Sequence, residues 1–238
     1  MAYQTVFKRY ELKYILTKAQ REALISEIEK HMIPDRYGRS TIRNIYFDND
    51  SYRLIRHSID KPAYKEKLRI RSYKEVGDAD TVFVELKKKY NGVVYKRRVS
   101  LPLSQAAAWL LKGCLPTDSQ IVREIEYFRS FYSPLSPKVF LSYDREAYYG
   151  KDDPSFRVTF DDNILCRQSD LSLASNVGGT PILDEDHVLM EIKCSGGIPL
   201  WMTGLLSKEK IYKTSFSKYG TAYTTLIFPY SKEDKTNA

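Results

Sequence analysis

The stretch Tyr-Lys-Glu-Lys-Leu-Arg-Ile-Arg-Ser-Tyr, residues 64–73, places a cation at every second position: Lys65, Lys67, Arg69 and Arg71. Alternate side chains of a β-strand leave the same face, so a strand here presents the four cations in one row, with Leu68 and Ile70 behind them. A row of like charges repels itself unless an opposite charge lies beside it. The stretch therefore indicates a strand that runs along a polyanion.

The same pattern recurs along the chain. Alternating polar and apolar residues predict eight strands, at 6–16, 41–48, 64–73, 82–90, 93–101, 138–148, 155–164 and 188–194. In seven of them charged side chains share one face: Arg9 with Glu11 and Lys13, the 65–71 row, Glu85 with Lys87, Lys96 with Arg98, Arg145, Arg157, and Glu191 with Lys193. The strand at 41–48 contributes Arg43, on the face that we assign to Ile45 and Phe47.

Helices and turns separate these strands. Thr17 and Gln20 form a capping-box pattern, which predicts a helix from there to about residue 32. Asn91-Gly92 predicts a tight hairpin, because both residues tolerate a positive φ. Further helices are expected at 50–58, 104–112, 119–132 and after residue 199, and a long loop at 167–186.

The charged faces have two interpretations. For any one strand, the simpler one is the solvated side of an open antiparallel sheet. Taken together, the rows contain far more arginine and lysine than glutamate, which favours strands closed into a tunnel with the charges inside and helices over the apolar outer faces. We therefore predict an α+β fold, a closed eight-stranded antiparallel β tunnel with a charged interior and helices packed outside, as a single domain over residues 1–238.

The overall charge points to an acidic partner. The net charge of +8 and the pI of about 9.2 suit nucleic acid, a membrane surface or a phosphate-rich small molecule. Most tyrosines fall on the apolar faces, which disfavours stacking on bases, so we expect no nucleic-acid partner. A cationic interior suits polyphosphate, because arginine forks bind phosphate oxygens.

The sequence shows no export or membrane signal. The N-terminus lacks a basic-then-apolar pattern, and no apolar run approaches membrane-spanning length. The three cysteines, Cys114, Cys166 and Cys194, have no metal-ligand spacing and are expected to be reduced. These features predict a cytoplasmic protein with no membrane segment in this chain.

Three glutamates interrupt the cations. Glu11, Glu85 and Glu191 each stand two residues before a lysine, so each could simply form a salt bridge within its row. In one cationic cavity the three could instead hold Mg²⁺ or Mn²⁺, which prefer carboxylate and phosphate oxygens. Glu191 is the first candidate ligand, and Asp161 is a fourth.

Several segments together resemble a known family, in order over nearly the whole chain. They are Arg-Tyr-Glu-Leu-Lys-Tyr (9–14), Lys-Leu-Arg-Ile-Arg (67–71), Val-Glu-Leu-Lys (84–87), Tyr-Asp-Arg-Glu-Ala-Tyr (143–148), Phe-Arg-Val-Thr-Phe-Asp (156–161), Met-Glu-Ile-Lys (190–193) and Phe-Ser-Lys-Tyr (216–219). This set is similar to the VTC domain, the catalytic module of polyphosphate polymerases among the triphosphate tunnel metalloenzymes, which are CYTH-like. The resemblance implies a tunnel that binds ATP and a divalent metal and transfers the γ-phosphate to polyphosphate.

The resemblance also assigns roles to residues. The implied catalytic cations are Lys13, Arg69, Arg71, Lys87, Arg145 and Arg157. The expected substrate-binding residues are Lys67, Lys96, Arg98, Lys193, Lys213, Ser217 and Lys218. The metal ligands would be Glu191, Glu11 and Glu85.

Two departures from the family pattern bear on these roles. Arg9 stands where the wider superfamily often has a first glutamate, which favours the polymerase branch over the thiamine-triphosphatase-like and adenylate-cyclase-like branches. Lys213 lies nearest to the position of a lysine that often precedes the Ser217-Lys218 pair. The sensing and membrane segments of the eukaryotic proteins are missing, so a membrane-protein partner is a further expectation.

Three functions remain open from the sequence. The first is metal-dependent polyphosphate polymerisation from ATP. The second is hydrolysis of inorganic or nucleoside triphosphate, with water as the acceptor. The third is non-enzymatic binding of polyphosphate or another polyanion. The glutamates argue against pure binding, because carboxylates in a cationic cavity do not help to bind an anion unless they hold a metal.

Overall fold

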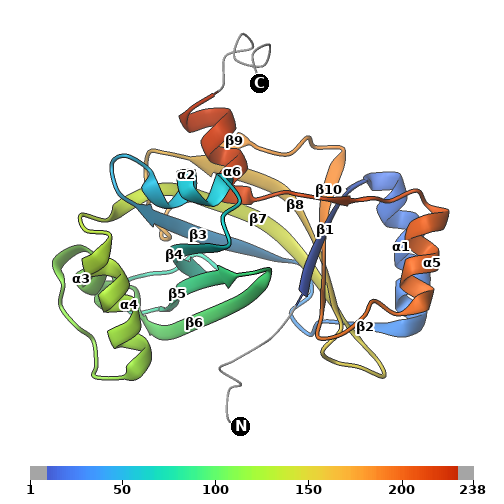
Figure 1. The fold of residues 1–238 in the computed structure, drawn as a ribbon, viewed down its shortest axis with the longest axis horizontal. Helices are drawn as coiled ribbons and strands as arrows, with labels where there is room; N and C mark the ends of the chain where they lie inside the picture. Colours follow the sequence, from blue (N-terminus) through green and yellow to red (C-terminus); the bar gives the residue numbers. More distant parts are fainter. Residues whose placement is uncertain (1–9, 230–238) are drawn as a thin grey trace.

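The computed structural model describes residues 10–229. All of the strands in this range belong to one antiparallel sheet, against which the helices pack (Figure 1). Within these residues the strands are β1 (Tyr10–Thr17), β2 (Met32–Pro34), β3 (Ser40–Asp48), β4 (Tyr64–Ser72), β5 (Thr81–Tyr90), β6 (Val93–Pro102), β7 (Ser136–Gly150), β8 (Arg157–Arg167), β9 (Thr180–Pro181), β10 (His187–Cys194) and β11 (Lys213–Thr214). The helices are α1 (Lys18–His31), α2 (Arg53–Ile59), α3 (Leu103–Lys112), α4 (Gln120–Phe131), α5 (Leu200–Lys208) and α6 (Lys218–Ala222), followed by a π-helical turn, η1 (Tyr223–Ile227).

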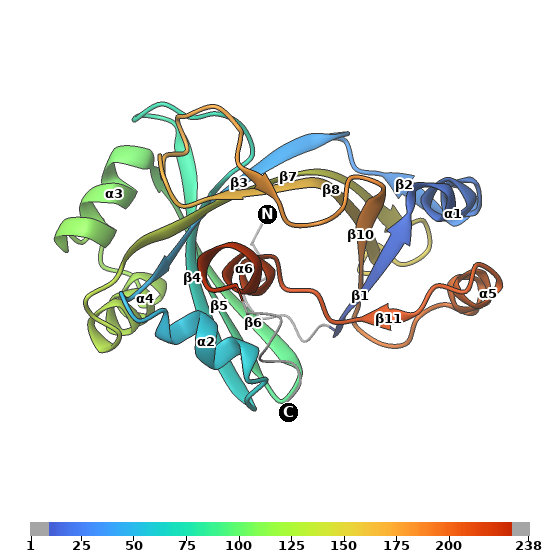
Figure 2. The same cartoon turned by 90° about the horizontal axis from the view of Figure 1, so that it is seen from above.

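The sheet is strongly curled but open. Its strand order is β11-β1-β10-β8-β7-β3-β4-β5-β6, with β2 added beside β7 and β9 beside β8 (Figure 2). The predicted closed tunnel of eight strands is therefore wrong, because the sheet has eleven strands within residues 10–229 and β1 does not pair with β6. The reason lies at the β1 edge, where β11 already pairs with Lys13 and Tyr14. Hydrogen-bonding groups that would close the ring are used by the C-terminal segment.

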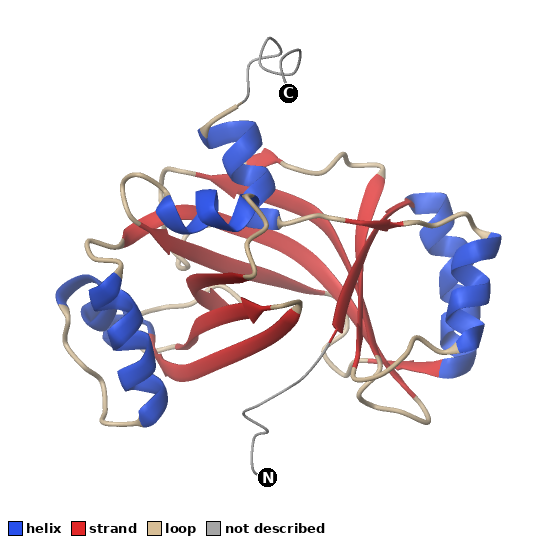
Figure 3. Cartoon of the chain, in the orientation of Figure 1, coloured by secondary structure: helices blue, strands red, loops and turns tan. Residues whose placement is uncertain are grey.

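Two hydrophobic cores cover the convex side of the sheet. At one end, α3 and α4 pack on β3, β4, β5 and β6, with Trp109 and Ile125 fully buried. At the other end, α1 and α5 pack on β1, β8 and β10 (Figure 3). The apolar side chains that alternate with the charged rows, such as Leu68 and Met190, form these cores. Burial of these faces fixes which side of each strand the cations occupy.

The third core lies on the concave side. Tyr219 and Ala222 of α6 pack there against Tyr46 and Leu141. The Tyr219 ring stacks on the ring of Tyr46 with 4.8 Å between centroids, and its hydroxyl donates to Asp48 at 3.2 Å. The prediction that helices pack outside holds for α1, α3, α4 and α5 and is wrong for α6.

Local signals identified most elements correctly. Thr17 and Gln20 form the predicted capping box of α1, and the hairpin between β5 and β6 has φ of 45° at Asn91 and 85° at Gly92. The predicted loop at 167–186 contains the short strand β9. No helix in the described part of the chain is long and apolar enough to span a membrane.

Candidate functional site

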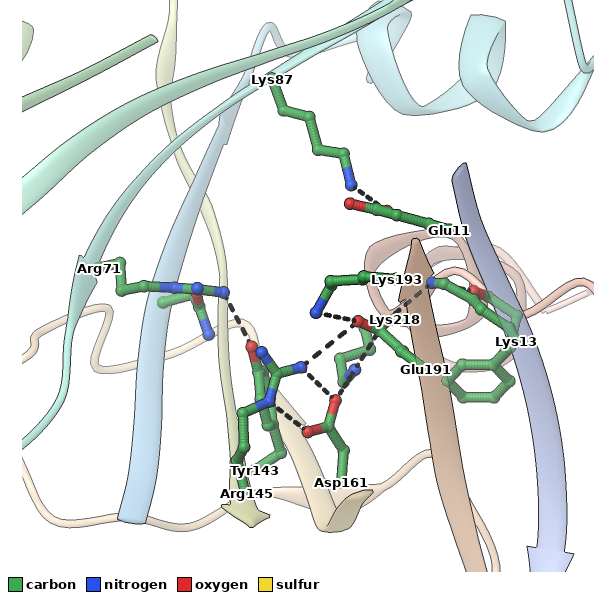
Figure 4. Close-up of polar contacts among 12 residues, drawn as sticks. Glu11, Lys13, Arg71, Lys87, Tyr143, Arg145, Asp161, Glu191, Lys193 and Lys218 are labelled. Atoms are coloured by element: carbon green, nitrogen blue, oxygen red, sulfur yellow. Dashed lines mark hydrogen bonds and ion pairs between the residues drawn. The ribbon is translucent and has the colours of Figure 1, made fainter. Parts of the chain in front are cut away.

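Charged side chains from seven strands and from α6 gather on the concave face. Figure 4 labels nine of these charged residues together with Tyr143, and they project inward from β1, β4, β5, β7, β8, β10 and α6. Glu11 of β1 pairs with Lys87 of β5 at 2.7 Å, although β10, β8, β7, β3 and β4 lie between those two strands in the sheet order. This contact shows how far the sheet curls.

Glu85 is the centre of the first charged group. Its side chain is only 1% exposed, yet four cations surround it. Arg69 donates from Nε and Nη2 to Oε2 at 2.8 and 2.6 Å, and Arg98 donates from Nε to Oε1 at 2.6 Å. Lys96 lies 2.7 Å from Oε1, and Arg71 lies 3.9 Å from Oε2. The register explains the convergence, because Glu85 pairs with Arg69 on one side and Arg98 on the other.

The charges of this group alter one another's ionisation. Burial opposes the charged form of Glu85, but the surrounding arginines and Lys96 outweigh it and hold the pKa of the carboxyl well below its usual range. Burial dominates for Lys96 and lowers its pKa to about 7, despite the attraction of Glu85. Near neutral pH, Lys96 is therefore poised between its two protonation states.

Glu191 and Asp161 form the second group, on the neighbouring strands β10 and β8. Arg145 binds Asp161 through Nε and Nη2 at 2.5 and 2.6 Å and reaches Glu191 at 3.5 Å. Lys218 lies 2.5 Å from Asp161 and 3.6 Å from Glu191. Lys13 and Lys193 are each 3.3 Å from Glu191. Asp161 and Glu191 thus share two cations, Arg145 and Lys218.

Burial and charge work against each other here as well. Burial would raise the pKa of Glu191, but Lys13, Lys218, Lys193 and Arg145 keep it well below the ordinary value. Burial lowers the pKa of Lys193 to about 8, although Glu191 partly offsets it. For Glu11, burial is outweighed by Lys87 and Lys193, and its pKa falls to about 2. All these carboxylates are therefore ionised at neutral pH.

The C-terminal segment closes over the same face. Lys13 Nζ donates to the carbonyl oxygen of Phe216 at 2.6 Å, and Lys67 Nζ donates to Ser217 Oγ at 2.9 Å. Ser217 also accepts from the backbone of Gly220 at 3.2 Å, which caps α6. The predicted substrate-binding residues Lys67, Ser217 and Lys218 are thereby brought together with the cations of β1, β7 and β10.

Some predicted residues lie elsewhere. Arg157, the first residue of β8, stands opposite Lys193 in the β8–β10 pairing, but its guanidinium pairs with Asp35 at 3.0 Å. Lys213 is exposed and stands opposite Tyr14 in the β11–β1 pairing, so it shares the outer face of Tyr14 rather than the inner face of Lys13.

The assignment of Arg43 to a charged inner row is wrong, because its guanidinium donates to the carbonyl oxygens of Leu173 and Ser175 on the convex side. Arg9 lies outside the described residues.

The family model of the VTC domain matches residues 8–227. The chain belongs to the VTC domain family. No curated protein matches the sequence. Among solved structures, a proposed adenylate cyclase from Bacillus halodurans has a TM-score of 0.57 at 16% identity, over 99% of this chain and 100% of that one. A proposed adenylyl cyclase from Hippeastrum with a dominant triphosphatase activity has a TM-score of 0.57 at 15% identity, over 93% of this chain and 98% of that one. At these identities the likeness shows a shared fold and nothing further.

Three uncharged residues of this VTC domain position its arginines, and the sequence did not identify them. Tyr46 accepts from Arg69 Nη1 at 2.9 Å, and Tyr143 accepts from Arg71 Nη2 at 2.8 Å. Asn44 accepts from Arg71 Nε at 2.9 Å. Tyr143 could have been found from its position two residues before Arg145. Asn44 and Tyr46 of β3 could not have been found, because the sequence pattern assigned the face of Arg43, and not theirs, to the inside of the sheet.

The predicted trio of metal ligands is not assembled. Glu11, Glu85 and Glu191 lie in three separate ion-pair groups, and residues 10–229 contain no cluster of three or more His, Cys, Asp or Glu side chains able to hold a metal. A single ligand is still chemically suitable. Mg²⁺ often binds through one or two carboxylates and completes its shell with water and phosphate oxygens. Glu191, ionised on the concave face with Asp161 beside it, fits that role in a VTC domain.

Proposed function

We propose that this VTC domain transfers the terminal phosphoryl group of ATP to a polyphosphate chain on its concave face. The observation that carries the proposal is the convergence of cations from β1, β4, β5, β6, β7, β10 and α6 around four carboxylates, those of Glu11, Glu85, Asp161 and Glu191. Few ligands other than a chain of phosphates can neutralise so extended a set. Phosphoryl transfer requires positioning and charge neutralisation more than covalent chemistry from the protein.

The arginines would hold the phosphates in place. Arg69 and Arg71 are fixed by Glu85, Tyr46, Tyr143 and Asn44, so their guanidinium groups are oriented before a ligand arrives. Preorganised donors stabilise developing charge without a reorganisation cost. Arg145 and Lys218, held by Asp161, would do the same at the second group.

Glu191 would hold a divalent cation, Mn²⁺ or Mg²⁺, which would supply charge neutralisation on phosphate oxygens. The protein's own contribution is to keep that carboxylate ionised, through Lys13, Lys193 and Arg145. The acceptor end of polyphosphate is already anionic and needs no general base. Lys13 of β1 and Lys87 of β5 are partly exposed, and their ammonium groups could bind phosphates of this acceptor chain.

Hydrolysis is the second candidate function, because water at the acceptor position turns the same arrangement into a triphosphatase. The Hippeastrum relative with dominant triphosphatase activity shares the fold, which supports this alternative. The choice between the two depends on which nucleophile enters, and the residues that bind the donor would be the same.

The deciding experiment is incubation of the purified protein with ATP and Mn²⁺, followed by separation of the products. Long-chain polyphosphate and ADP are expected. Free phosphate without polymer would establish the triphosphatase, and binding of polyphosphate without turnover would leave a polyanion-binding module. The presence of a membrane-protein partner gains no support from the structure.

A matched pair of lysines tests the site itself. Lys218→Ala removes a cation that contacts both Asp161 and Glu191, and turnover should fall by about 100-fold, as for other preorganised charge-stabilising groups. Lys213→Ala removes an exposed cation on the other face and should leave turnover unchanged. Equal effects of the two substitutions would contradict the proposed site. Circular dichroism and thermal unfolding would confirm that both variants are folded.

A further inference from the structure

The cationic row on β4 ends in an aromatic side chain rather than in another charge. Tyr73 follows Arg71 by two residues and is 43% exposed. Its ring packs edge-on against the ring of Phe83, with 5.5 Å between centroids and 75° between planes. Phe83 pairs directly with Arg71 in the β4–β5 register, so it lies on the same face as the cations. Two aromatic rings therefore continue the line of the arginines.

Arg98 joins these rings to the first charged group. Its guanidinium carbon lies 4.4 Å from the centroid of Phe83 and 6.0 Å from that of Tyr73. Its Nη2 donates to the Tyr73 hydroxyl at 2.9 Å, and its Nε donates to Glu85 at 2.6 Å. The aromatic pair is therefore adjacent to the arginines assigned to the phosphates.

Aromatic rings offer little to a phosphate. The ring faces carry negative potential, and Phe83 has no hydrogen-bond donor. A flat, conjugated ligand is a better partner, because bases stack on aromatic side chains and on arginine planes. A ligand that is polyanionic at one end and flat and aromatic at the other matches the order of groups along β4 and β5. Nucleoside triphosphates have this chemistry.

We propose that Tyr73, Phe83 and Arg98 form a subsite for the base of a nucleoside triphosphate. The triphosphate of the bound nucleotide runs from this subsite toward Arg71 and Arg69. The inference rests on the proposed function, since it takes the concave face as the triphosphate site. It adds that the donor binds in one direction and that the base contributes to affinity.

Binding without turnover tests the subsite. Titration calorimetry in EDTA compares ATP with inorganic tripolyphosphate, which has the same charged portion and no base. Tyr73→Ala should lower the affinity for ATP by about tenfold, the size expected for loss of one base–aromatic stack. Its affinity for tripolyphosphate should stay within about twofold, because the cations are intact. Tyr73→Phe, which keeps the ring and loses the hydroxyl, should retain the affinity for ATP.

The outcomes separate this inference from the proposed function. Equal losses for ATP and tripolyphosphate would show that Tyr73 only supports Arg98, and unchanged affinity for both would show that the base binds elsewhere; either result overturns the subsite and leaves the triphosphate site standing. Failure of the unaltered protein to bind tripolyphosphate both in EDTA and with Mg²⁺ present would overturn the proposed function as well. A measurement that needs no variant is the affinity for ribose triphosphate without a base, which should be about tenfold weaker than for ATP. Equal affinities would overturn the subsite.

Discussion

At the level of single residues, the buried carboxylates make a dense set of cations compatible with a folded chain. Glu85 is 1% exposed and Asp161 is fully buried, and each neutralises guanidinium and ammonium groups that would otherwise repel one another. Removing one such carboxylate leaves several buried cations uncompensated, which costs more than the pair contributes. These residues therefore hold the site together before any phosphate binds.

Glu191 should be required for metal-dependent turnover, whereas the protein should still fold when its charge is removed. Glu191→Gln keeps the size of the side chain and loses its charge, so activity with Mn²⁺ should disappear while thermal unfolding still shows a cooperative transition. Metal binding, followed by Mn²⁺ electron paramagnetic resonance in the presence of tripolyphosphate, should weaken as well. Asp162→Asn is the matched control, because Asp162 binds Arg39 on the other face of β8. Full activity of the Glu191 variant would refute its role as a ligand.

Lys96 should make triphosphate binding sensitive to pH near neutrality. Its pKa is about 7, so it is charged below that pH and loses its charge as the pH rises. An anion binds the charged form, and the affinity for tripolyphosphate should therefore fall between about pH 6 and 9 relative to Lys96→Arg, which stays charged throughout. Calorimetric titrations of both proteins across this range would measure the difference. Parallel pH profiles would show that Lys96 does not face the ligand.

At the level of secondary structure, the alternation of residues predicted a strand well where one face is buried and the other charged. In β4 the charged row and the buried Leu68 and Ile70 separate cleanly. In β3 nearly every residue is buried, because helices and loops cover both faces, so no period-2 contrast exists. Arg43 was therefore assigned to the wrong side, and Asn44 and Tyr46 were missed. The strands β2 and β11 are too short to leave a pattern.

The capping box of α1 should contribute to stability without affecting ligand binding. Thr17 accepts from the backbone of Gln20 at 3.1 Å, and α1 packs on the convex side of the sheet. Thr17→Ala should lower the free energy of unfolding by about 1 kcal/mol, the usual cost of losing a threonine cap. Urea denaturation would measure this change. The tripolyphosphate affinity of the variant should equal that of the unaltered protein, and a loss of affinity would mean that α1 supports the site.

At the level of the whole molecule, the closure of the sheet was the part that the sequence could not determine. The number of long strands and the inner position of most cations follow from local patterns, whereas the gap between β1 and β6 depends on the two-residue strand β11. The position of α6 depends equally on contacts between distant segments, such as Tyr219 with Asp48. Periodicity describes one strand at a time and carries no information about these pairings.

The ionised carboxylates should make the fold sensitive to acid. Glu85, Asp161 and Glu191 all have a lowered pKa, with burial outweighed by neighbouring cations. A carboxylate with a lowered pKa stabilises the folded state above its ordinary value of about 4, and the stabilisation is lost as the pH falls below that value. Urea denaturation should therefore give a free energy of unfolding that decreases steeply from about pH 5 to 3. A flat profile over this range would contradict the ion-pair groups.

If the concave face acts on polyphosphate as proposed, the gap between β1 and β6 also bears on how a long polymer would reach and leave it. A ring sealed by backbone hydrogen bonds admits a polymer only by threading from its end. Here the contacts across the gap include those of single lysines, Lys13 to Phe216, Lys67 to Ser217 and Lys87 to Glu11, each of which can break independently. A linear product could then be loaded or shed sideways at any point along its length. Processivity would be governed by how long the seam stays shut, and not by the length of polymer already made.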